Sequence, residues 1–230
     1  MADYIRKSIL SQAYAHIEGV SLDQGMKADF EVQIAEYQKP RAKILLGKEI
    51  IPEIRTRDGS LKVYSTVYGS LSDALGEFTD FQQALNMLYA SSKMLADACN
   101  LESLFLSRGK KNAMVRSEAR TGIVKSTKDM FDRVLLLIEA KQPESHVKIT
   151  SNIADIEKKV IFLNEQLDYG RDKELIWSKF SPLLKKLSST IHKSQVSPNS
   201  DRLTMYKNTL TDISKQIEKF RIQGDRDDEL

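Results

Sequence analysis

Apolar residues recur at alternating steps of three and four in the last third of the chain, and this spacing constrains the fold more than any other feature. Two series have this spacing: Ile153, Ile156, Val160, Leu163 and Leu167; and Leu203, Tyr206, Leu210, Ile213, Ile217 and Phe220. Between them, one face of a further helix carries Ile176, Phe180, Leu183, Leu184, Leu187 and Ile191. Such spacing places one narrow apolar seam along each helix. It predicts an antiparallel three-helix bundle over residues 150–224, because helices joined by short loops can satisfy one another.

Residues typical of helix ends accompany this pattern. Asn152 with Asp155 suits a helix start, and Gly170 suits a C-terminal cap. The segment "SPNS" (197–200) predicts a turn, and Gly224 is expected to end the last helix. Residues 225–230, which end in "DDEL", are interpreted as a charged tail rather than an ER-retention signal.

The first residues, "MADYIRKSILSQAYAHIEGV", predict an amphipathic helix with Tyr4, Ile5, Ile9 and Ile17 toward a core. They contain no apolar run of signal-peptide length. No stretch of the chain approaches the roughly 20 apolar residues that cross a bilayer, so we expect no membrane partner. The single Cys99 cannot form an internal disulfide, which favours a reducing, cytoplasmic location.

Further helices are predicted before residue 145. Ser21 with Gln24 forms a capping box that opens one helix, and Pro40 should kink it or end it just beforehand. Ser70 with Asp73 opens another helix, which extends to about Leu106. A fourth helix is expected from about 112 to 140, followed by a domain boundary within 141–148.

One β-hairpin interrupts these helices, at about 51–67. Asp58-Gly59 predicts a two-residue turn, with alternating residues on both sides. Arg55, Arg57, Lys62 and Tyr64 would then share one face. The predicted fold is mainly α: a helical domain over 1–145 with this inserted hairpin, and then the three-helix bundle.

Most signatures of enzymes and cofactor sites are missing. Gly47-Lys48 lacks the earlier glycine and the following Ser or Thr of a phosphate-binding loop. One cysteine and three scattered histidines cannot form a local zinc site. We expect Cys99 and Trp177 to be core residues. The chain is therefore predicted to be non-enzymatic, with no cofactor and no metal.

The segment "SRGKKNAMVRSEARTGIVKSTK", residues 107–128, concentrates positive charge. Its seven basic residues are Arg108, Lys110, Lys111, Arg116, Arg120, Lys125 and Lys128, against the single acid Glu118. This excess of six exceeds the net charge of +3 of the whole chain, so charge is segregated. On the expected helix, Arg116 and Arg120 would lie one turn apart on one side. The preceding "SRGKKN" would offer lysines and backbone amides to phosphates near the helix start.

A polyanion site follows if the hairpin cations Arg55, Arg57 and Lys62 fall on the same side as this segment. Tyr64 and Tyr68 would add stacking on unpaired bases. The alternative is that the cations only solubilise a helix pair and bridge to neighbouring acids.

The stretch "ADACNLESLFLSRG" (96–109) is similar to a helix in the UvsY family of phage recombination mediators, which load a recombinase onto single-stranded DNA. The similarity requires a gap and carries no residue role over to this chain. It implies only a slight preference for single-stranded over double-stranded partners.

Three hypotheses remain open from the sequence. The first is a non-enzymatic nucleic-acid-binding or accessory protein that uses the hairpin and the basic segment. The second is a helical structural or adaptor protein whose seams assemble with other copies or other proteins, the basic segment contacting an acidic protein surface. The third is a hydrolase with a dispersed site. Salt-dependent binding, an exposed apolar patch and a deep pocket with converging acids, respectively, would distinguish them.

Overall fold

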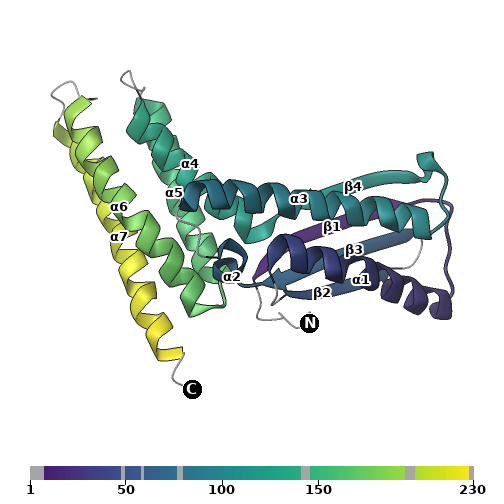
Figure 1. Cartoon of the computed structure of the whole chain (residues 1–230). Coiled ribbons are helices and arrows are strands. Elements are labelled where there is room, and N and C mark those ends of the chain that lie inside the picture. Colours follow the sequence, from purple (N-terminus) through teal and green to yellow (C-terminus); the bar gives the residue numbers. More distant parts are fainter. Residues whose placement is uncertain are drawn as a thin grey trace. The chain divides into compact units, whose positions relative to one another are not determined.

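The structure, a computed structural model (Figure 1), describes residues 8–47, 50–57, 60–76, 80–140, 146–194 and 200–227. It is mainly helical, as predicted, and it also contains a four-stranded antiparallel sheet. The chain forms two compact units, Met1–Lys125 and Ser126–Leu230. They divide within the first turn of a helix rather than in the expected boundary at 141–148.

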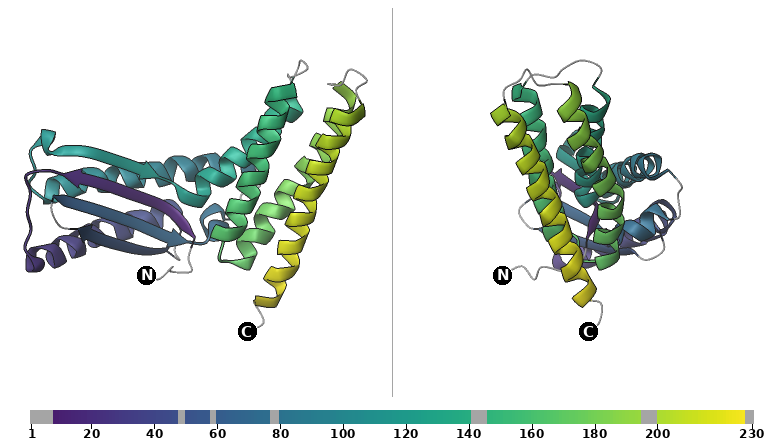
Figure 2. Two further views of the ribbon diagram at one scale, coloured as in Figure 1. Left: turned by 180° about the vertical axis from the view of Figure 1, so that it is seen from behind. Right: turned by 90° about the vertical axis from the view of Figure 1, so that its left-hand side faces the viewer.

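The first unit alternates strands and helices. Its elements are β1 (Ile9–Ile17), α1 (Gln24–Leu46), β2 (Ile50–Arg57), β3 (Leu61–Gly69), α2 (Leu71–Leu75), α3 (Phe81–Leu106), a 3-10 turn (Lys111–Ala113), β4 (Met114–Arg120) and the start of α4 (Gly122–Glu139). The sheet order is β2-β3-β1-β4, which is the split βαβ arrangement. Helices α1 and α3 lie against one face of the sheet, and Figure 2 (left) views it from the other face.

The prediction of an N-terminal helix is wrong where the structure describes this segment, because Ile9–Ile17 forms β1. Its residues alternate between the two faces of the sheet: Ala13, Ala15 and Ile17 are buried, and the residues between them are half-buried. Tyr4 and Ile5 lie outside the described residues. The apolar spacing of Ile9 and Ile17 fits a helix and a strand equally well, and the pairing of β1 with β3 and β4 decides between them.

The predicted hairpin is present as β2 and β3, with a loop longer than two residues. Its terminal pair is Arg57 and Lys62, so residues 58–61 lie between them. Asp58 and Gly59 themselves lie outside the described residues. The register pairs Arg55 with Tyr64, which places the three predicted cations on one face.

Helix α1 begins differently from the prediction, and of the two predicted effects of Pro40 the ending of the helix is wrong. Asp23, rather than Ser21, is the N-cap, and its carboxylate accepts a hydrogen bond from the amide of Met26. The helix continues through Pro40 to Leu46. Its buried residues face the sheet and α3, and this packing outweighs the backbone hydrogen bond that proline cannot donate.

The helix predicted from Ser70 to about Leu106 is two helices. Ser70 caps α2 as expected, because its hydroxyl accepts from the amide of Asp73. Gly76 ends α2 with a φ of 59°, and α3 begins after a second cap at Asp80. The helix expected from Asn112 is also wrong at its start, since residues 114–120 form β4 and the helix begins only at Gly122.

The second unit contains most of α4 together with α5 (His146–Gln166), α6 (Gly170–Ser194) and α7 (Ser200–Asp227). The seam residues of α5 are buried, and so are Ile176, Phe180, Leu184 and Leu187 of α6 and Tyr206, Leu210, Ile213 and Ile217 of α7. Leu183 is half-buried, and the side chains of Ile191, Leu203 and Phe220 lie outside the described residues. The apolar spacing thus predicted these three helices and their buried faces.

Helix α4 is an addition to the expected three-helix bundle. Its Phe131 ring lies 5.1 Å from that of Phe180 on α6. The predicted helix ends are wrong at three positions: α5 begins at His146 rather than near Asn152, Gly170 begins α6, and α7 continues past Gly224. Of the predicted turn 197–200, the structure describes only Ser200, where α7 begins.

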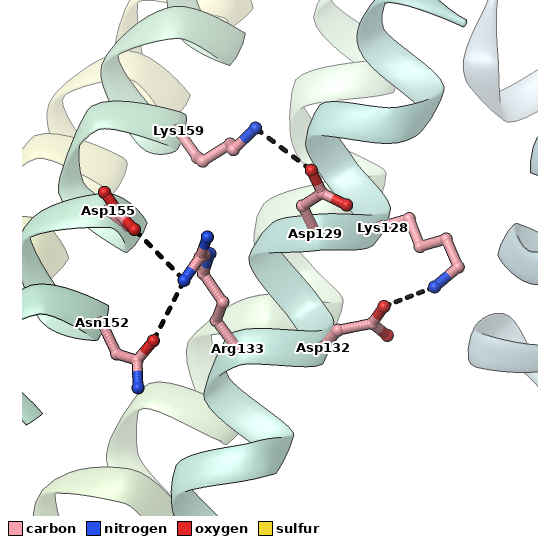
Figure 3. A network of polar contacts seen from close by, with 7 residues as sticks. All are labelled: Lys128, Asp129, Asp132, Arg133, Asn152, Asp155 and Lys159. Atoms are coloured by element: carbon pink, nitrogen blue, oxygen red, sulfur yellow. Dashed lines mark hydrogen bonds and ion pairs between the residues drawn. The ribbon is translucent and has the colours of Figure 1, made fainter. Parts of the chain in front are cut away.

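Polar contacts join α4 to α5 (Figure 3). Arg133 Nη1 lies 3.0 Å from Asn152 Oδ1 and 3.1 Å from Asp155 Oδ2. Lys159 Nζ lies 3.4 Å from Asp129 Oδ2. Asn152 is therefore a buried partner for Arg133 in the interior of α5 rather than a helix cap.

Candidate functional site

The face of the sheet opposite α1 and α3 carries the densest set of basic and aromatic side chains that the sequence predicted. Opposed residues in antiparallel strands project to the same side, so the register defines three rows across all four strands. In the order β2, β3, β1, β4, the rows are Arg57, Lys62, His16, Arg116; then Arg55, Tyr64, Tyr14, Glu118; then Glu53, Thr66, Gln12, Arg120. We call this surface the open face (Figure 2, left).

The middle row has two tyrosines at its centre. The rings of Tyr14 and Tyr64 come from the two central strands, and their centroids lie 5.0 Å apart at 46°. Both residues are half-buried. Arg57 lies over the Tyr64 ring at 5.2 Å, and Arg116 lies over the Tyr14 ring at 5.8 Å. These cation–π contacts join the aromatic pair to the first row, which consists of Arg57, Lys62, His16 and Arg116 and which we call the basic row.

The basic row places cations at both edges of the sheet, with His16 between them. In the strand register, the exposed Arg57 lies opposite Lys62, and His16 lies opposite Lys62 on one side and Arg116 on the other. His16 Nε2 lies 2.5 Å from Ser60 Oγ. The row therefore presents a line of positive charge across the strands, which suits a polyanion lying over the sheet.

Glu53 orders one side of the open face. Its carboxylate accepts hydrogen bonds from Arg55 Nε at 2.7 Å and from the hydroxyl of Tyr68 at 2.8 Å. This pairing raises the pKa of Arg55. Burial, together with the hydrogen bond to Glu53, raises the pKa of Tyr68 to about 12, so this hydroxyl remains a donor at neutral pH.

Glu118 has the same role on β4. It lies between two arginines, forms an ion pair with Arg116, and accepts a hydrogen bond from Arg120 Nε at 2.7 Å. The hydrogen bond from Arg120 holds the pKa of the Glu118 carboxyl below its usual range, against a smaller opposing effect of burial. Both guanidinium groups are more than half exposed, so they keep unused donors directed at solvent.

Five of the ten predicted site residues lie on the open face: Arg55, Arg57, Lys62, Arg116 and Arg120. The two arginines of the basic segment share a side as predicted, although the reason is that an even spacing on a strand keeps them there, and not one turn of a helix. The hairpin and part of the basic segment therefore share one surface.

The other five predicted residues are not among the rows. Arg108 and Lys110 are exposed in the connection from α3 to β4, and the side chain of Lys111 lies outside the described part of the chain. This connection passes the end of β1, since the amide of Glu18 donates to the carbonyl of Ala113 at 2.8 Å. Lys125 and Lys128 lie on α4, and Lys128 pairs there with Asp132. The sequence-based prediction of one continuous cluster over 107–128 is thus only partly matched.

Sequence reasoning did not identify Gln12, Tyr14 and His16, which occupy the centre of the open face. Their spacing of two in "SQAYAHI" is the signal of a strand, but small residues fill the alternate positions. Ser11, Ala13 and Ala15 bury little apolar area, so the alternation in hydrophobicity is faint.

The described residues include no group of three or more His, Cys, Asp or Glu side chains able to hold a metal ion. Cys99 is fully buried, and burial raises the pKa of its thiol to about 11, so it is not an activated nucleophile. Trp177 is a core residue, as predicted: it is 1% exposed, and its ring centroid lies 6.2 Å from that of Phe180.

In the described part of the chain, every helix is too short or too polar to span a lipid bilayer. The chain matches no family model, no curated protein and no solved structure. The similarity of residues 96–109 to a UvsY helix has no support from these comparisons.

Proposed function

We propose that the first unit binds single-stranded nucleic acid across the open face, with no catalytic step. Tyr14 and Tyr64 stack on two unpaired bases, and the basic row contacts the phosphates beside them. The observation that carries this proposal is the pair of adjacent tyrosine rings on the two central strands, each with an arginine over it. Base–aromatic stacking contributes about 1–3 kcal/mol per base and accepts any base.

The shape of the surface favours single strands over duplexes. A four-stranded sheet is too broad to enter a groove, whereas bases splayed from a single strand can lie on aromatic rings of a sheet, as in other sheet-based RNA binders. The third row, which consists of Glu53, Thr66, Gln12 and Arg120, adds hydrogen-bonding groups that can contact base edges. In this row, Gln12 Nε2 donates a hydrogen bond to Thr66 Oγ1 at 3.2 Å, which positions the Gln12 side chain. This element order also occurs in proteins of many other functions, so the proposal depends on the side chains rather than on the topology.

The charges of the open face suit a phosphate backbone. Five arginines and lysines in its rows outweigh Glu53 and Glu118. The two carboxylates hold Arg55, Arg116 and Arg120 in place, which reduces the entropy lost when these side chains contact a ligand. A site of this kind binds with salt-dependent affinity and little sequence preference.

Fluorescence anisotropy with labelled single-stranded RNA, single-stranded DNA and duplex DNA tests the proposal, at about 50 and 200 mM salt. We expect the full chain to bind the single strands more tightly than the duplex. Tyr14→Ala and Tyr64→Ala should each weaken binding about tenfold, equally at both salt concentrations, because stacking is uncharged. Arg57→Ala and Arg116→Ala should instead each reduce the slope of the logarithm of the binding constant against the logarithm of the salt concentration by about one, which corresponds to one released counterion.

The chain offers a matched control on the other layer of the same unit. Arg41 lies 3.6 Å over the ring of Tyr37 on α1, which covers the opposite face of the sheet. Tyr37→Ala and Arg41→Ala remove the same chemistry and should leave binding unchanged. Equal losses from both sets of variants, or no binding to single strands at low salt, would show that the open face is not a nucleic-acid site.

The second candidate function is a structural or adaptor protein. It is favoured by exposed apolar side chains on α3, among them Leu101 and Phe105.

A further inference from the structure

An apolar stripe runs along the side of α3 that is turned away from the sheet. Its large members are Met87, Met94, Leu101 and Phe105, with exposed fractions of 54%, 55%, 66% and 76%. The exposed Ala90 and the half-buried Ala98 lie between them. Together, these six positions recur at steps of three and four, which is the spacing of a coiled-coil seam. We call this set the α3 seam.

The opposite side of the same helix already forms the core of the first unit. Leu85, Leu88, Leu95 and Cys99 are buried, so α3 is held in place without using its seam. The neighbouring helix α1 has no comparable stripe: its exposed large apolar residues Met26, Val32 and Ile44 lie six and twelve positions apart rather than three or four. An ordered apolar seam of this length on one helix is typical of an interaction surface.

We infer that the α3 seam pairs with the α3 seam of a second copy of this chain, in antiparallel orientation. A two-fold axis near Ala96 sets Met87 opposite Phe105 and Met94 opposite Ala98, since the members of each pair are equally distant from position 96. Large side chains then face small ones in the middle of the helix, which permits close approach. Methionine adapts well to such contacts.

The charges beside the seam are self-complementary in this orientation. Lys93 and Asp97 form an exposed ion pair at 2.6 Å within one helix. About the same axis, Lys93 of one copy lies level with position 99 of the other, two residues or about 3 Å along the helix from Asp97, and the reverse pair forms by symmetry. In a parallel pairing, the flank that carries Lys93 and Asp97 would lie on opposite sides of the interface in the two copies, so these charges could not pair. Charge therefore favours the antiparallel dimer.

The dimer leaves the open face free, because the α3 seam and the open face are on opposite sides of the first unit. The inference does not depend on nucleic-acid binding. Two open faces in one particle would, however, increase the apparent affinity for a strand long enough to reach both of them.

Analytical ultracentrifugation of the full chain up to about 100 µM tests the inference, since contacts with micromolar Kd are populated in this range. The wild type should be a dimer, and Met94→Glu and Leu101→Glu should be monomers with unchanged circular dichroism. Val32→Glu, at a position exposed to 56% but outside the seam, is the matched control and should remain dimeric. A monomeric wild type, or dissociation of the control to the same extent, would overturn the inference.

Charge-swap variants test the orientation. Lys93→Glu and Asp97→Lys should each weaken self-association about tenfold, because each one places like charges together across the axis. An equimolar mixture of the two variants should recover wild-type association, since opposite charges meet again in the heterodimer. Failure of the mixture to recover would overturn the antiparallel pairing, even if the seam variants are monomeric.

Discussion

Replacement of Gly122 by alanine should destabilise the first unit strongly. Gly122 follows β4 with a φ of +45°, a conformation that costs a residue with a Cβ about 1–2 kcal/mol. The added Cβ would also lie 2.2 Å from the carbonyl oxygen of Ile9. Relief of that contact requires a shift of about 1 Å at the start of β1, and forced shifts of packed structure cost about 1–3 kcal/mol. We expect a total of about 3 kcal/mol.

Gly19→Ala separates the two contributions. Gly19 also has a positive φ, of +71°, but no atom lies within 4 Å of the position of its Cβ. This variant should lose only the backbone contribution, about 1 kcal/mol. The difference between the two variants, about 2 kcal/mol, then measures the contact between residue 122 and β1.

Cys99 provides the assay because it is the only cysteine and is fully buried in the first unit. Pulsed thiol labelling in urea reports the unfolding of this unit, whereas Trp177 lies in the second unit. With a slope of about 2 kcal/mol per molar urea, the midpoint should fall by about 1.5 M for Gly122→Ala and by about 0.5 M for Gly19→Ala. Equal midpoints for the two variants would refute the argument from the Ile9 contact.

Two further predictions concern polar contacts. Arg133→Met should destabilise the second unit by about 1–2 kcal/mol, measured by Trp177 fluorescence in urea, because the buried Asn152 loses the donor of its hydrogen bond. Lys128→Met, which removes an ion pair with Asp132 on the same helix, should cost less than about 0.5 kcal/mol. Equal losses of stability in the two variants would contradict this account. The pKa of Tyr68 is about 12 in the folded chain and about 10 in the unfolded chain. The protonated hydroxyl therefore contributes fully to the free energy of unfolding below pH 10, and this contribution is lost as the pH rises to 12. Between pH 9 and 12, the wild type should therefore lose roughly 1 kcal/mol more stability than Tyr68→Phe, after allowance for the exposed part of the ring, and parallel curves by circular dichroism would exclude this contribution.

The helices of the second unit could be predicted from the sequence because their spacing is local. Ile153, Ile156 and Val160 lie within two turns of one another, so the local sequence alone places them on one apolar face, and all three are buried. Helix ends were harder to predict: Gly224 can stop a helix, but nothing in its neighbourhood requires it to, and α7 continues past it.

The sheet could be predicted only where its pairing is local. The hairpin of β2 and β3 has a turn signal at Asp58-Gly59, and the predicted side shared by Arg55, Arg57 and Lys62 agrees with the register. The strand β4 is an edge strand with few buried side chains, so "MVRSEAR" carries no clear alternation. Its partner β1 is distant in sequence, and the Tyr14–Tyr64 pair at the centre of the candidate site depends on that long-range pairing.

The central position of β1 has a consequence for biosynthesis. This strand leaves the ribosome before the other three strands of its sheet, yet its pairing with β4 is complete only after Arg120, more than one hundred residues later. Closure over such a distance is slow, so nascent chains pass through a stage in which β1, β2 and β3 have formed a sheet that still lacks β4. During that stage β1 is an unpaired edge, and neighbouring chains on one polysome can pair with it. Translation that stalls before Met114 should therefore produce aggregates, and a chaperone that covers β1 should prevent them.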